Sequence, residues 1–167
     1  MFVRAEKPSD QKSVHKLNLA AFDGSAEAKL VDGLRENADP VVSLVAEDNG
    51  EIVGHIMFSP VAHSADPALK LMGLAPMAVV PDRQKAGIGA ALICAGLERC
   101  NEMGVVGVVV LGHPNYYPRF GFVPSSRYKI VSEYDVPEEV FMVIELLDGA
   151  LNDKPGRVHY HREFSKI

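Results

Sequence analysis

The stretch that decides the fold is VVPDRQKAGIGAALICAGL, residues 79–97. It begins with apolar β-branched residues, which favour a strand, and ends with small and apolar residues, which favour a helix. Between them the loop 84–89 carries two glycines one residue apart. Glycine allows a sharp turn and a close approach of another molecule to the backbone. The pattern predicts a strand, a glycine loop and a helix that begins with accessible amides.

The start of this helix is a candidate anion site. The first N–H groups of a helix have no intrahelical partner, and the dipole is positive there. Glycines beside such a terminus suit phosphate or pyrophosphate, and Arg83 and Lys85 add positive charge. The alternative is that Gly87 and Gly89 only permit a tight turn and close helix–sheet packing. The spacing matches neither the P-loop nor the dinucleotide fingerprint.

The flanking sequence predicts a mixed sheet. Strands at 41–47, 51–61 and 69–80 form an antiparallel meander, with a hairpin signal at Asp48-Asn49-Gly50. A helix at 87–103, ended by Gly104, then leads to a buried strand at 105–111, which implies one parallel crossover. The remaining expected elements are a strand at 2–6, a helix that starts at Pro8-Ser9-Asp10, a helix at 25–37, a short helix at 115–120, and strands at 141–147 and 158–164.

Composition sets limits on the function. The 167 residues suit one domain, 1–167, with 47 % apolar and 23 % charged residues. A net charge of −5 argues against a general nucleic-acid binder. The longest apolar run, 105–111, is far shorter than a membrane span needs. Cys94 and Cys100 are six positions apart on one helix and cannot pair, so free thiols favour a cytoplasmic setting.

Two motifs resemble those of the GNAT N-acetyltransferases. Residues 77–89 resemble motif A of that family, in which a glutamine and two glycines follow an apolar strand and a Val-x-Pro turn; the marked positions are Gln84, Gly87 and Gly89. The segment YPRFGF, 117–122, looks like the family's Tyr-x-x-x-Gly-Phe element. The order of elements fits over nearly the whole chain. Two further segments are similar in sequence to the YhbS-like branch of the family: GHIMFSPV and VVVLGHPNYYPRFGF.

The resemblance implies a fold and a co-substrate. The fold is α/β, with a mixed, largely antiparallel central sheet of about seven strands, flanking helices and the acyl-CoA N-acyltransferase topology. The strand before the loop splays from the strand 105–111 to admit acetyl-CoA. Pro76 fits a strand that bulges and opens, although an edge position would explain it too. Amides at 85–90 bind the pyrophosphate, while the edge 77–79 pairs with pantetheine. The implied CoA-binding residues are Met77, Ala78, Val79, Gln84, Lys85, Ala86, Gly87, Ile88, Gly89, Ala90, Asn115 and Tyr117.

The resemblance also implies catalytic roles. Tyr117 occupies the position where the family has a general acid that protonates the CoA sulfur. A shift of the alignment by one residue would assign this role to Tyr116 instead. The backbone amide of Val79 is the expected oxyanion donor. No acid lies on the strand 69–80, so His55 and His113 are the candidates for a general base, unless the base is ordered water.

The other constellations are weaker. Glu27 could line the acceptor cleft, but a solvated helix face is the favoured interpretation. His159 and His161 share a strand face without a third ligand, so we expect no metal. The cysteines lack a catalytic partner, so a direct transfer in a ternary complex is expected.

The sequence therefore predicts an N-acetyltransferase that acts on a primary amine, of a small molecule or, as the nearest variant, of a protein. A non-catalytic acyl-CoA-binding module is the competing class. The polar segment 123–137 should frame the acceptor site. The positive charges of Arg127 and Lys129 are balanced by the negative charges of Glu133 and Asp135, so the segment does not indicate the charge of the acceptor. A homodimer is reasonable; nucleic acid and membranes are not expected as partners.

Overall fold

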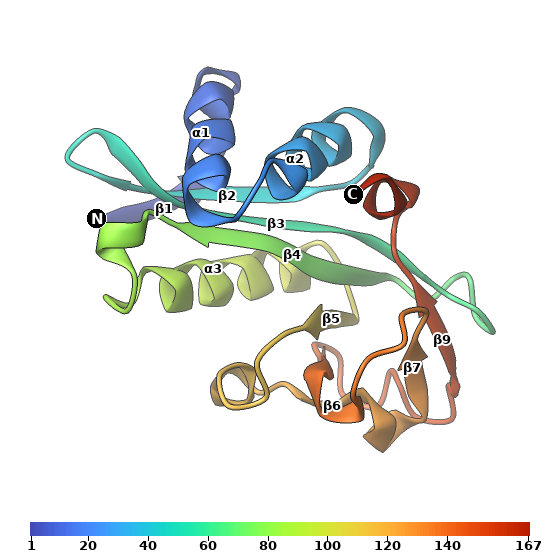
Figure 1. Ribbon diagram of the computed structural model, residues 1–167. Helices are drawn as coiled ribbons and strands as arrows, with labels where there is room; N and C mark the ends of the chain where they lie inside the picture. The colour runs from blue at the N-terminus through green and yellow to red at the C-terminus, as the bar shows by residue number, and fades with distance from the viewer.

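The computed structural model describes residues 1–167 as a nine-stranded sheet with helices on both faces (Figure 1). None of the helices is long and apolar enough to cross a membrane. Single turns of 3-10 helix connect several of the elements. The helices are α1 (Gln11–Ala21), α2 (Ala26–Asn37) and α3 (Ile88–Glu102). The strands are β1 (Phe2–Ala5), β2 (Val42–Asp48), β3 (Glu51–His63), β4 (Leu71–Val79), β5 (Gly107–Leu111), β6 (Val123–Pro124), β7 (Ile130–Ser132), β8 (Phe141–Glu145) and β9 (Gly156–His159).

The strand order β1-β2-β3-β4-β5-β8-β6 confirms the predicted mixed sheet. Within this order neighbours are antiparallel except β4 and β5, which are parallel because α3 crosses between them; outside it, β7 and β9 are also parallel. β9 pairs with the end of β3 and carries β7 beside it. Helices α1 and α2 lie on one face, and α3 lies on the other (Figure 1).

The helix α3 is held between two glycines, as the sequence predicted. Gly87 before it and Gly104 after it have φ of +88° and +81°, a region that L side chains rarely adopt. The helix covers the largest core cluster. Gly96 makes this close packing possible, because a Cβ there would meet the ring of Phe58.

The carboxyl-terminal part departs from the prediction. The strand expected at 158–164 is wrong: β9 ends at His159, and residues Arg162–Lys166 form a 3-10 helix. The reason is a polar anchor, since Glu163 Oε1 accepts a hydrogen bond from Asn37 Nδ2 of α2 at 2.9 Å. The short strands β6 and β7 were missed because two or three residues show no period. The helix expected at 115–120 is one 3-10 turn, Tyr117–Phe120.

The sheet opens between β4 and β5. Their parallel pairing covers only three residue pairs and ends at Gly73 opposite Val109. Beyond it β4 bulges: Leu74 pairs with Phe58 and Met77 with Ile56, so two residues, Ala75 and Pro76, stand opposite one. The expectation of a strand that bulges and opens at Pro76 is confirmed.

Candidate active site

The loop before α3 exposes a row of backbone amides. Gly87 adopts a left-handed conformation as the residue before the helix, and a Cβ there would meet nothing within 4 Å. The first helical bond of α3 is donated by Ala91 to Gly87 O, at 3.1 Å. The amides of residues 88–90 therefore have no helical acceptor. This geometry is suited to an anion that approaches the backbone directly.

A cavity of about 570 Å³ lies over these amides. Three basic side chains and no acidic one line it, so its charge favours a polyanion. The residues of the sequence prediction that line it are Met77, Val79, Gln84, Lys85, Gly87, Ile88, Gly89 and Ala90. The residues of the prediction that do not line it are Ala78, Ala86, Asn115 and Tyr117.

Three further residues line this cavity, Arg83, Tyr116 and Arg119. The sequence indicated Arg83 as nearby positive charge, but it missed Arg119 and gave Tyr116 no role at the cavity. Arg83 is held by Asp48, with 2.8 Å between Nη2 and Oδ2. The guanidinium of Arg119 lies 4.7 Å from the ring centroid of Tyr116. A basic residue three positions after a tyrosine on a tight turn was the available signal for this stacked pair.

The open edge of β4 presents the amide of Val79. Val80 donates its N–H to Val53 O of β3 at 3.0 Å, and successive N–H groups of a strand point to opposite edges. The N–H of Val79 therefore points toward the side from which β5 has diverged. Gln84 Nε2 donates to Val79 O at 3.2 Å and ties the loop to this edge. By the same alternation, Ala78 turns its N–H toward β3, and its side chain is buried.

Tyr117 and Tyr116 take different positions. Tyr117 packs over Gly112 and makes an edge-to-face contact with Phe122, at 5.6 Å between centroids. Burial raises the pKa of Tyr117 to about 12, so its hydroxyl stays protonated at neutral pH. Tyr116 instead points its hydroxyl toward the loop, 3.3 Å from where a Cβ of Gly89 would be. Tyr116 therefore lines the basic cavity, whereas Tyr117 is packed behind it against Gly112 and Phe122.

His55 belongs to a buried polar relay. Ser43 Oγ donates to Glu6 Oε2 at 2.7 Å and lies 2.8 Å from His55 Nε2. Because the Ser43 hydroxyl donates its only proton to Glu6, it accepts a hydrogen bond from the Nε2–H of His55. The Nδ1 atom of the neutral ring is then an acceptor without a partner. Burial lowers the pKa of His55, which keeps the ring neutral. His113 is exposed, and its Nδ1 accepts the N–H of Asn115 in a turn, at 3.3 Å.

Four buried side-chain atoms make no hydrogen bond within the chain: Asn18 Oδ1, Glu27 Oε1, His55 Nδ1 and Ser59 Oγ. All four can accept a hydrogen bond, which water or an amine can supply. Glu27 therefore does not lie on a fully solvated helix face. Sequence reasoning missed Asn18 and Ser59, although an asparagine on the apolar face of α1 was a usable signal. No three His, Cys, Asp or Glu side chains come together as metal ligands do.

Comparisons with known proteins agree with this geometry. Residues 39–124 match the acetyltransferase (GNAT) domain family. The uncharacterized N-acetyltransferase YhbS of Escherichia coli K12 is 37 % identical over 168 residues, which covers 100 % of both chains.

Two solved structures extend the match. The crystal structure of Escherichia coli YhbS in complex with CoA has a TM-score of 0.92 and 36 % identity, covering 98 % of this chain and 91 % of that one. A GNAT acetyltransferase from Brucella melitensis in complex with acetyl-CoA has a TM-score of 0.80 and 33 % identity, covering 98 % and 97 %. The chain belongs to the GNAT family of N-acetyltransferases.

Proposed function

We propose that this N-acetyltransferase moves acetyl from acetyl-CoA to a primary amine of a small molecule, by direct transfer in a ternary complex. A protein amino group is the nearest variant. The observation that carries the proposal is the open edge of β4, which leads from the bulge at Ala75–Pro76 into the basic cavity over the amides of α3.

The donor half uses backbone and basic groups. The amides of residues 88–90, with Lys85 and Arg119, bind the pyrophosphate, and the edge at Met77 and Val79 pairs with pantetheine. Gly87 leaves the space that a phosphate needs, because a Cβ there would lie in the open cavity. The solved complexes of the Escherichia coli and Brucella melitensis relatives with CoA and acetyl-CoA support this assignment.

The transfer needs groups for two protons and one oxyanion. The amine nitrogen attacks the thioester carbon, and the Val79 N–H stabilises the oxyanion, worth about 10²–10³ in rate. When the C–S bond breaks, the Tyr117 hydroxyl gives its proton to the sulfur, worth about 10²–10⁴. The proton lost by the amine goes to ordered water in the acceptor cleft.

Two measurements separate this enzyme from a non-catalytic CoA-binding module. Thermal unfolding with and without CoA measures binding, and release of free thiol from acetyl-CoA with a panel of primary amines measures turnover. The enzyme is expected to be stabilised by CoA and to release thiol together with an acetylated amine. Stabilisation without turnover on a broad panel favours the binding module. No stabilisation by CoA contradicts both.

A further inference from the structure

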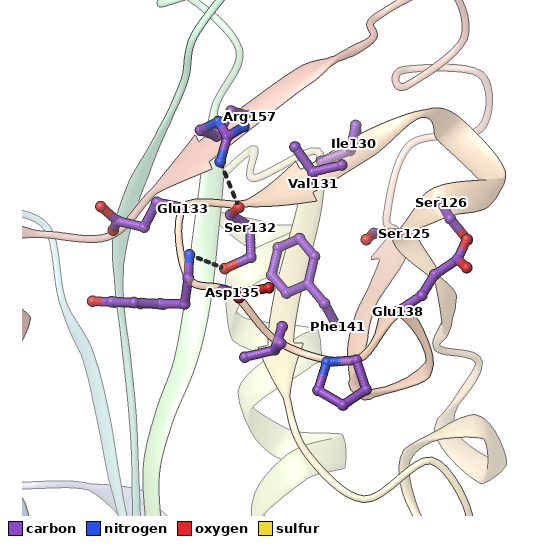
Figure 2. Close-up of a pocket in the computed structure, with 13 residues that line it drawn as sticks. Ser125, Ser126, Ile130, Val131, Ser132, Glu133, Asp135, Glu138, Phe141 and Arg157 are labelled. Carbon is purple, nitrogen blue, oxygen red and sulfur yellow. Dashed lines mark hydrogen bonds between the residues drawn. The ribbon is translucent and has the colours of Figure 1, made fainter.

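A second cavity, of about 460 Å³, lies in the carboxyl-terminal part of the molecule (Figure 2). Its walls are the turn at Ser125–Ser126, the strand β7, the loop 133–138, Phe141 at the start of β8, and Arg157 of β9. The volume is that of a small-ligand pocket. The segment 123–137, which the sequence predicted to frame the acceptor, forms most of this cavity.

The fold sorts the charges of this segment, which the sequence alone left balanced. Arg127 and Lys129 do not line the cavity; they lie beside residues 151–155, around a different depression. Three carboxylates and one guanidinium line the cavity, a formal charge of −3 + 1 = −2. These residues are Glu133, Asp135, Glu138 and Arg157. The cavity therefore favours a cation.

Some of these charges already have partners. Glu133 Oε1 accepts the N–H of Tyr160 at 2.7 Å, and its Oε2 lies 3.4 Å from His159 Nδ1. Arg157 Nη1 donates to the carbonyl of Ser132 at 3.1 Å, a bond drawn in Figure 2. Asp135 and Glu138 have no partner drawn in Figure 2 and form no ion pair. Their carboxylates are free to bind a cation from outside.

The cavity also holds unused polar and apolar surface. The Ser125 side chain is only 2 % exposed, yet it lines the cavity, and its hydroxyl has no partner in Figure 2. Val131 and Tyr134 are 47 % and 39 % exposed, and the ring of Phe141 lies between Asp135 and Glu138 in Figure 2. A ligand with an aliphatic body and a hydrogen-bond-donating cation would cover the apolar wall and satisfy these acceptors.

The cavity lies next to the place where the sheet opens. Its Tyr134 ring is 5.7 Å from that of Tyr160. The Tyr160 ring lies over Gly73, since a Cβ there would be 2.8 Å from its Cε1. Gly73 is the last residue of β4 that pairs with β5, and Phe141 pairs with Leu111, the last residue of β5. One extended ligand can thus reach from the cavity to the gap between these strands.

We propose that this acidic cavity binds the far ammonium group of the acceptor, so that the acceptor is an aliphatic diamine or polyamine. The far ammonium pairs with one of the two free carboxylates, Asp135 or Glu138, which flank the Phe141 ring, while Ser125 offers a hydroxyl and Val131 and Phe141 cover the methylene chain. The near amine reaches the gap and receives the acetyl group. This inference rests on the proposed function and adds the substrate class.

The test compares aliphatic diamines with monoamines of the same chain length. The wild-type enzyme is expected to acetylate the diamines with a KM at least about tenfold lower, equivalent to about 1.4 kcal/mol. The double variant Asp135→Asn/Glu138→Gln should lose this preference and keep its KM for acetyl-CoA and its melting temperature. Glu139→Gln is the matched control, because Glu139 is the exposed neighbour that does not line the cavity.

The outcomes separate this inference from the proposed function. Acetylation of monoamines and diamines alike, or a diamine preference that survives in the double variant, overturns the inference and leaves the N-acetyltransferase function intact. A preference for amines that carry a carboxylate, lost in Arg157→Gln, also overturns it. If no amine is acetylated, calorimetric titration of the CoA-saturated protein with a diamine decides: binding that the double variant loses supports the cavity, and no binding contradicts it.

Discussion

The CoA loop and the acidic cavity are built in opposite ways. The loop draws most of its binding groups from one continuous segment, 83–90, and its cavity carries three basic side chains. The acidic cavity draws on the segment 125–141 and on Arg157 of β9, and it carries a formal charge of −2. The basic cavity offers backbone amides to its ligand, whereas the acidic cavity offers side chains. The opposite charges match the anionic donor and the cationic acceptor that we propose.

The largest effect should come from Gly87→Glu. The glutamate side chain would enter the basic cavity and repel the CoA pyrophosphate, and the φ of +88° would strain its backbone. We therefore expect calorimetry to detect no CoA binding. Gly104→Glu is the matched control, since its φ is +81° and it also has open space, at the other end of α3. CoA binding retained by the Gly87 variant, or lost equally in both, would contradict the assignment of the loop.

Tyr117→Phe should lower kcat about a hundredfold or more, because it removes the proton donor and keeps the ring that packs on Phe122. CoA affinity should stay the same. Tyr116→Phe is the comparison, because Tyr116 lines the CoA cavity and its loss should raise the KM for acetyl-CoA instead. Steady-state kinetics of both variants measures this; a fall in kcat with Tyr116→Phe alone would exchange the two roles.

Gly96→Ala and Gly89→Ala should separate stability from binding. A Cβ on Gly96 would meet the Phe58 ring, so we expect a loss of about 1–2 kcal/mol after the gain in helix propensity. This lowers the melting temperature by about 3–6 °C and leaves CoA affinity unchanged. Gly89→Ala should leave the melting temperature of the free protein unchanged and lower the CoA affinity, because its Cβ would point toward Tyr116 and the basic cavity. Thermal unfolding with and without CoA distinguishes the two.

The last effect is confined to low pH and concerns the buried relay of Glu6, Ser43 and His55. Burial raises the pKa of Glu6, but hydrogen bonds from His55, Arg35 and Ser43 outweigh it and lower the pKa from 4.5 to about 2. A lowered pKa stabilises the fold above the ordinary value and loses this effect as the pH falls from about 5 toward 2. We expect the free energy of unfolding to fall by about 2 kcal/mol over that window. Chemical denaturation at several pH values measures this. The free energy of unfolding of Glu6→Gln should depend less on pH between about 5 and 2 than that of the wild-type protein.

Local signals account for what the sequence could predict. The meander, the hairpin at Asn49-Gly50, the helix between Gly87 and Gly104, and the bulge at Pro76 each depend on neighbouring residues. Two such motifs indicated the family, and most of the predicted loop residues line the basic cavity over the amides of α3. The same reasoning failed for the strand at 158–164, since the anchor of Glu163 on Asn37 joins residues far apart in the chain.

The acidic cavity could not be predicted from the sequence for the same reason. Nothing in the order of the residues says that Arg127 and Lys129 turn away from the cavity while Glu138 faces it. Nor does it reveal that Asn18 and Ser59 bury oxygen atoms without partners. These features exist only once the helices and β9 are placed on the sheet.

The most direct test of the account is a structure of the protein with CoA and a diamine bound. We expect the pyrophosphate on the amides of residues 88–90, the sulfur between β4 and β5 within hydrogen-bonding distance of the Tyr117 hydroxyl, and the far ammonium in the acidic cavity, paired with Asp135 or Glu138. A sulfur held by Tyr116 outside the gap, or a diamine seated away from the acidic cavity, would contradict it.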